Sequence, residues 1–124
     1  MSREAQENRN MNGETVSEMA DTRIYVGLND SETRKQKFDT GKYLDLLKKV
    51  CKNYHVAFSV HVEEGGYFHD DGEYTEECSL VLELIDADRA IIEEIAMDLC
   101  TFFHQESVLV TTSRIQAEYI RVKL

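Results

Sequence analysis

The sequence lacks proline and tryptophan altogether, and its 124 residues include only six glycines and three cysteines. These low counts exclude collagen-like and low-complexity chains, which are rich in glycine or proline. Cys51, Cys78 and Cys100 are an odd number without close spacing, which argues against a disulfide framework or a zinc site. We therefore expect three reduced cysteines in the core, no metal and no cofactor.

Long apolar runs are also missing. No stretch approaches the roughly 20 apolar residues that span a bilayer, and the segment from Met1 to Ala20 has no apolar core of the kind that marks a secretory signal. We therefore expect no membrane contact and a cytoplasmic location. A hydrophobic content of 42% is sufficient for one domain that folds without metal or disulfide.

Basic residues are scarce, since 14 lysines and arginines stand against 24 aspartates and glutamates and leave a net charge of −10. This balance disfavours direct binding to nucleic acid. The charge is uneven: residues 22–54 carry about +4 and residues 55–106 about −13. A basic and an acidic patch on one molecule are complementary, which favours a polar partner or head-to-tail self-association, with improved solubility as the simpler alternative.

The periodicity of apolar residues predicts four strands and two helices after a flexible tail over residues 1–21. The strands are expected over residues 22–28, 56–63, 78–84 and 107–119, and the helices from Asp39 or Thr40 to Tyr54 and from an N-cap at Asp86 to Phe103. The order βαββαβ predicts a single α+β domain over residues 22–124. Its expected fold is ferredoxin-like, a four-stranded antiparallel sheet with two helices on one face.

The second and third strands are expected to form a long hairpin that projects beyond the sheet. The pair Asp71-Gly72 is typical of the turn, because glycine tolerates a positive φ. Gly65 and Gly66, side by side in the hairpin, predict a bulge or bend.

Three short stretches carry a resemblance to a known family: Ile24 to Leu28, Gly66-Tyr67 through Gly72 to Glu76-Glu77, and Gln105 to Val108. They resemble the aromatic-Gly-Leu strand, the hairpin tip and the Gln-Glu-Ser-Val element of domain-of-unknown-function family 3574. That family comprises small bacterial proteins. The resemblance implies the ferredoxin-like fold and supplies no catalytic residues.

The hairpin holds the densest group of charged side chains, without a lysine or arginine among them. Such an acidic arm is expected to dock a basic protein partner, or to imitate nucleic-acid phosphates towards one. A divalent cation site and a solvated hairpin that discourages aggregation are the alternatives. The predicted partner-binding residues are Glu63, Glu64, Asp70, Asp71, Glu73, Glu76 and Glu77.

The open face of the sheet is the second candidate site. His61, Tyr25 and Glu83 are expected there, as candidates for catalysis in a cleft enclosed by two sheets. A histidine buried at a dimer interface is the simpler alternative. The other residues predicted on this face are Ala57, Ser59, Val81 and Ile85.

No familiar hydrolase, nucleotide-binding or deaminase motif occurs in the sequence. We therefore predict a small binding or regulatory protein of bacterial or phage type. It is expected to act by binding a partner and not by catalysis. It is expected to form a homo-oligomer, with a dimer favoured, and to act through the acidic hairpin. The alternative is a small-ligand sensor or enzyme with its cleft on the open face of a dimeric α+β barrel.

Overall fold

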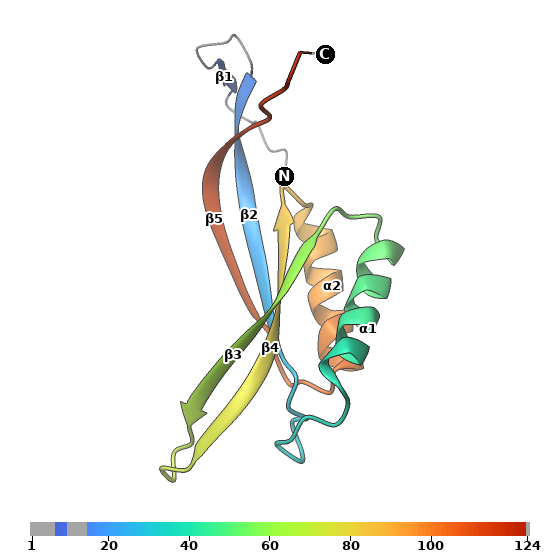
Figure 1. Cartoon of the computed structure of the whole chain (residues 1–124), viewed down its shortest axis with the longest axis vertical. Coiled ribbons are helices and arrows are strands. Elements are labelled where there is room, and N and C mark those ends of the chain that lie inside the picture. Colours follow the sequence, from blue (N-terminus) through green and yellow to red (C-terminus); the bar gives the residue numbers. More distant parts are fainter. Residues whose placement is uncertain (1–6, 10–14, 124) are drawn as a thin grey trace.

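The computed structural model describes residues 7–9 and 15–123 (Figure 1). Within these residues, two helices and five strands follow one another. In order, they are β1 (Glu7–Arg9), β2 (Thr15–Gly27), α1 (Thr40–Asn53), β3 (Ser59–Phe68), β4 (Tyr74–Ile85), α2 (Arg89–Phe102) and β5 (Leu109–Glu118).

The strands form one antiparallel sheet. Strand β2 lies between β5 and β4, β3 is the outer neighbour of β4, and the short β1 pairs with the start of β2. Helices α1 and α2 lie side by side on one face, while the β3–β4 hairpin extends past them (Figure 1). The predicted ferredoxin-like α+β fold is confirmed.

The core lies between the helices and the sheet. It forms because side chains two apart on a strand share a face, so Ile24 and Val26 point to the same side as Leu80 and Leu82. These four side chains are fully buried, as is Leu99 of α2. Between the helices, the Tyr54 hydroxyl donates a 2.7 Å hydrogen bond to Asp98 Oδ2.

The predicted boundary of the flexible tail is wrong. Residues 15–21 belong to β2, and its register with β5 runs from Val16 opposite Glu118 to Tyr25 opposite Leu109. The error arose because this segment lacks a sustained apolar period. The backbone of β5 nevertheless supplies hydrogen-bonding partners that do not depend on such a period. Residues 1–6 and 10–14 of the predicted tail lie outside the described residues.

Two local predictions are also corrected. The N-cap of α2 is Asp88, because Asp86 adopts a φ of 55° and donates its backbone N–H to Ala20 O at 2.7 Å, which ends the β4 ladder. Gly65 and Gly66 form no bulge, since the pairing of β3 with β4 continues through both without a break in register. The predicted turn is confirmed, with Gly72 at a φ of 88°.

Candidate functional site: an acidic pocket at the base of the hairpin

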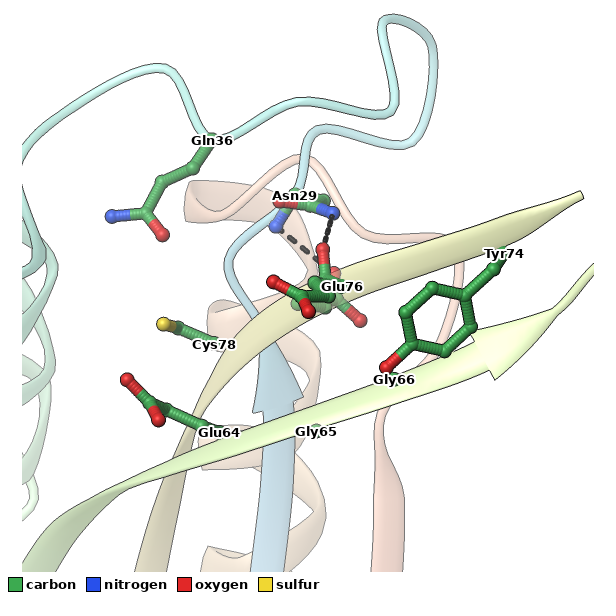
Figure 2. Close-up of a pocket in the computed structure, with 9 residues that line it drawn as sticks. Asn29, Gln36, Glu64, Gly65, Gly66, Tyr74, Glu76 and Cys78 are labelled. Carbon is green, nitrogen blue, oxygen red and sulfur yellow. Dashed lines mark hydrogen bonds between the residues drawn. The ribbon is translucent and has the colours of Figure 1, made fainter.

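A pocket of about 530 Å³ lies between the β3–β4 hairpin and the loop that follows β2 (Figure 2). This is large enough for a small organic ligand. Three of its nine lining residues are glutamates, and none of the nine is a lysine or an arginine. The lining residues are Asn29, Gln36, Glu64, Gly65, Gly66, Tyr74, Glu76, Glu77 and Cys78.

The strand register explains why polar groups gather here. Glu64 pairs with Cys78 and Gly66 with Glu76, and these positions continue the face that carries Leu80 in the core. Because the hairpin extends beyond the helices, no helix covers the distal part of that face (Figure 1). The face therefore changes from apolar to polar where it leaves the core, and the polar part forms one wall of the pocket.

Asn29 fixes the loop against this wall. It is 9% exposed, its backbone N–H donates to Glu77 Oε2 at 3.0 Å, and its side-chain Nδ2 donates to the backbone oxygen of Glu76 at 3.1 Å. Its own carbonyl accepts a 2.6 Å hydrogen bond from Gln105 Nε2. Asn29, in the loop after β2, is thus bonded both to β4 (Figure 2) and to the connection between α2 and β5.

The three glutamates differ in their freedom to bind a ligand. The Glu77 carboxylate is held by Asn29, whereas the exposed Glu64 and Glu76 side chains make no ion pair or side-chain hydrogen bond with any described residue. Two carboxylates are therefore available to a cation or to a hydroxyl donor from a ligand.

Tyr74 and Gly66 form the far end of the pocket. The Tyr74 hydroxyl lies over Gly66, where a Cβ atom would collide with it (Figure 2). The Tyr74 ring also contacts the Phe68 ring, with centroids 5.1 Å apart. The absence of a side chain at position 66 allows the Tyr74 ring to lie close against β3.

The seven predicted hairpin carboxylates do not form one site. Glu64, Glu76 and Glu77 line the pocket, and Glu63 lies on the opposite face with its Oε1 4.0 Å from His61 Nε2. The remaining three, Asp70, Asp71 and Glu73, are exposed at the hairpin tip. Within the described part of the chain, no group of three or more His, Cys, Asp or Glu residues is arranged to hold a metal ion.

The residues of the second predicted site lie on one face of the sheet, but they do not line the acidic pocket. Val81 pairs with both Tyr25 and His61, and Ser59 pairs with Glu83, so these residues share the predicted face, but Val81 on it is fully buried. The acidic pocket contains none of the three catalytic candidates, and Glu83 Oε2 forms an ion pair with Arg23 Nη2 at 3.2 Å. The pocket opens on the helix-side face instead of the predicted one.

The three cysteines are unpaired, but only Cys51 is fully buried. Burial raises the pKa of the Cys51 thiol to about 11, which keeps it protonated at neutral pH. Cys78 is half-buried and lines the acidic pocket, so its predicted place within the core is only partly correct.

Among the described residues, neither helix is long and apolar enough to cross a membrane. No family model matches the chain, so the resemblance to domain-of-unknown-function family 3574 stays a prediction. No curated protein matches it either.

Solved structures that share the fold include two of a phage SAM lyase. A phage SAM lyase in complex with S-methyl-5′-thioadenosine is 20% identical with a TM-score of 0.59, and the match covers 83% of this chain and 93% of that one. A phage SAM lyase in the apo state is 22% identical with a TM-score of 0.56, over 82% and 92% of the two chains. Similarity at this level of identity shows the fold alone.

Proposed function

We propose that this protein binds S-adenosylmethionine in the acidic pocket and cleaves the bond between its sulfur and its four-carbon amino-acid chain. The observation that carries the proposal is a small-molecule pocket with no basic lining residue and two carboxylates, Glu64 and Glu76, that pair with none of the described residues. S-adenosylmethionine bears a sulfonium and an ammonium group against one carboxylate, so its net positive charge fits this pocket. The fold shared with a phage SAM lyase bound to S-methyl-5′-thioadenosine adds support.

The proposed reaction balances without an added reactant. S-methyl-5′-thioadenosine retains the methyl and adenosyl groups of S-adenosylmethionine, so the bond that breaks is the one from sulfur to Cγ. Its electron pair stays on sulfur, which becomes a neutral thioether. The carboxylate of the substrate forms a new bond to Cγ, and the four-carbon fragment leaves as a lactone with its ammonium group unchanged. No proton is transferred, so the protein needs to supply no base.

This charge change constrains the roles of the pocket carboxylates. A carboxylate against the sulfonium would stabilise the substrate more than the transition state, in which the positive charge on sulfur is already diminishing. A carboxylate against the ammonium group, or one that accepts hydrogen bonds from the ribose hydroxyls, interacts with both states equally. We therefore assign Glu64 and Glu76 to substrate binding, with the Tyr74 ring beside them as an apolar surface for the ligand.

The test is incubation of the full chain with S-adenosylmethionine and detection of S-methyl-5′-thioadenosine by liquid chromatography with mass spectrometry. Glu64→Gln and Glu76→Gln are expected to raise KM by about tenfold each, with a smaller effect on kcat, because lost uniform binding appears in KM. Glu94→Gln, at an exposed position of α2 outside the pocket, is the matched control.

Binding and cleavage are measured separately by isothermal titration calorimetry with S-methyl-5′-thioadenosine. Binding without turnover would contradict the lyase activity and leave a ligand sensor. Failure to bind both S-adenosylmethionine and S-methyl-5′-thioadenosine would contradict the assignment of the pocket to this ligand class. Equal losses in Glu94→Gln and Glu76→Gln would show that net charge, and not the pocket, is responsible.

Contact with a basic protein through the hairpin tip is a second candidate function. It is favoured by two exposed aromatic side chains, Phe68 at 74% and Tyr74 at 55%, beside the tip carboxylates. A labelled lysine-rich peptide is expected to bind the protein in fluorescence anisotropy, and Asp70→Lys with Asp71→Lys is expected to abolish binding. Unchanged binding by this variant would contradict the role of the tip.

Three unpaired cysteines fit a reducing compartment, so we also propose a cytoplasmic location.

A further inference from the structure

We propose that the protein self-associates head to tail, with the hairpin tip of one copy seated in an aromatic groove beside α1 of the next copy. The inference rests on the second candidate function, contact through the hairpin, and not on cleavage of S-adenosylmethionine. It assigns the partner as a second copy of this chain.

The groove lies along α1. Its other walls are Phe102 at the end of α2 and Phe38 in the loop that precedes α1. It has a volume of about 340 Å³, and a neighbouring cavity of about 210 Å³ shares three of its aromatic residues. Phe38 and Phe102 are 46% and 52% exposed, which is unusual for large aromatic side chains in a single copy. The groove residues are Phe38, Lys42, Tyr43, Asp45, Leu46, Lys49 and Phe102.

The edge of the groove is basic. The Lys42 Nζ atom lies 4.1 Å from the centroid of the Phe38 ring, and Lys49 also lines the groove. Asp45 is the single carboxylate among the seven groove residues. The groove therefore combines aromatic surface with a small excess of positive charge.

The hairpin tip has the matching properties. The Phe68 and Tyr74 rings contact each other at a tilt of 50° with centroids 5.1 Å apart, and the turn between them carries Asp70, Asp71 and Glu73. The tip thus combines aromatic surface with negative charge, the complement of the groove. Phe68 is the more exposed ring and is the natural anchor for the groove, because buried aromatic side chains dominate contact energies.

The tip is unsuited to fill the groove of its own chain. The β3–β4 ladder pairs every residue of β3 up to Phe68 opposite Tyr74, so the hairpin cannot fold back on its own chain without breaking these pairs. Figure 1 shows the hairpin diverging from α1 towards its tip. A second copy satisfies both surfaces without bending the ladder.

The contact is heterologous, since the two surfaces differ, and a pair of copies joined in this way keeps one free tip and one free groove. Wild-type protein is therefore expected to form rings or short chains that grow with concentration. Because the complementary charges lie at the surface, assembly is expected to weaken as the salt concentration rises.

The test uses full-length protein in size-exclusion chromatography with light scattering. The groove variant is Lys42→Glu with Lys49→Glu, and the tip variant is Phe68→Ser with Asp71→Lys; all four side chains are exposed, so the fold is expected to persist. Each variant alone should be monomeric. An equimolar mixture should give a species of two chains, because the intact tip of the groove variant fits the intact groove of the tip variant.

The matched control is Lys35→Glu with Lys48→Glu, which makes the same charge change at exposed positions outside the groove. It should assemble as the wild type does. A monomeric mixture of the groove and tip variants, or a groove variant that assembles normally, would overturn the inference. Wild-type protein that stays monomeric and still binds the lysine-rich peptide would overturn self-association alone. Wild-type protein that stays monomeric and does not bind the peptide would also overturn the proposed contact with a basic protein through the hairpin tip.

Discussion

The carboxylate of Glu77 accepts a 3.0 Å hydrogen bond from the backbone N–H of Asn29, 48 positions earlier in the chain. Glu77 lies on the face of β4 opposite to Glu76, yet its carboxylate reaches Asn29 because Gly27 has no side chain in its path. A Cβ atom at Gly27 would lie 2.6 Å from Glu77 Oε2. One carboxylate is therefore used to build the pocket, which leaves Glu64 and Glu76 to bind within it.

Gly27→Ala is expected to destabilise the protein by about 1–3 kcal/mol. The new methyl group displaces the Glu77 carboxylate, and the N–H of the buried Asn29 loses a charged acceptor, which costs about this much. The measurement is the free energy of unfolding from urea denaturation.

The same substitution in a Glu77→Ala background supplies the control. With the carboxylate already absent, alanine is expected to be neutral or to stabilise by up to about 1 kcal/mol, because glycine is unfavourable within a strand. An equal cost in the two backgrounds would show that Gly27 is required for a reason other than Glu77.

Gly66→Ala is expected to weaken binding of S-adenosylmethionine by about tenfold. A methyl group at this position collides with the Tyr74 hydroxyl and pushes the ring away from β3. Because Tyr74 is 55% exposed, the ring can move without unfolding the hairpin, so stability is expected to change by less than about 1 kcal/mol. Calorimetric titration measures the affinity.

Gly65→Ala is the matched control, since the nearest atom to its added Cβ would be the Glu77 carbonyl oxygen at 4.0 Å. Its affinity should stay within about twofold of wild type. Adding Tyr74→Ala should make Gly66→Ala nearly neutral in binding, because the collision is removed. A large loss at Gly65, or an unchanged loss at Gly66 without Tyr74, would contradict the role assigned to the ring.

The fold was predictable because its strands and helices have clear apolar periods. Ile24 and Val26 of β2 and Leu28 directly after it alternate with less buried residues, and all three are fully buried. The start of β2 was not predictable in the same way, since residues 15–21 are held by pairing with β5. Pairing between segments about 100 residues apart depends on backbone hydrogen bonds that leave no local pattern in the sequence.

The acidic composition of the hairpin was predictable, but its division into a pocket, a tip and an opposite face was not. Sequence parity places Glu64 and Glu76 on the helix-side face, and that signal was available. The contribution of Asn29 and Gln36 was not, because a loop's path across the hairpin has no periodic signature. The site predicted around His61 on the open face therefore does not coincide with the pocket.

Tyr54→Phe is expected to destabilise the protein at pH 8 and to have a diminishing effect above pH 10. The hydrogen bond to Asp98, together with burial, raises the Tyr54 pKa from its usual 10.0 to about 12. A raised pKa means that the folded state stabilises the protonated hydroxyl, so this contribution is complete below pH 10 and is lost as the pH rises towards 12.

The measurement is the urea unfolding free energy of both proteins at pH 8, 10 and 11. Deprotonation of the buried Cys51 thiol, whose pKa is about 11, affects wild type and Tyr54→Phe alike and cancels in their difference. A difference that is constant from pH 8 to pH 11 would contradict the assignment.

His55→Gly is expected to stabilise the protein by about 0.5–1 kcal/mol. His55 follows α1 with a φ of 54°, a left-handed conformation that costs an L-residue roughly 1–2 kcal/mol and glycine almost nothing. The greater freedom of glycine in the unfolded chain offsets part of this gain.

His104 follows α2 with a similar φ of 51°, but its Nδ1 lies 3.4 Å from Asp30 Oδ2, so His104→Gly should stabilise the protein less than His55→Gly. Urea denaturation compares the two variants, and a larger gain at His104 than at His55 would show that backbone strain does not determine the effect.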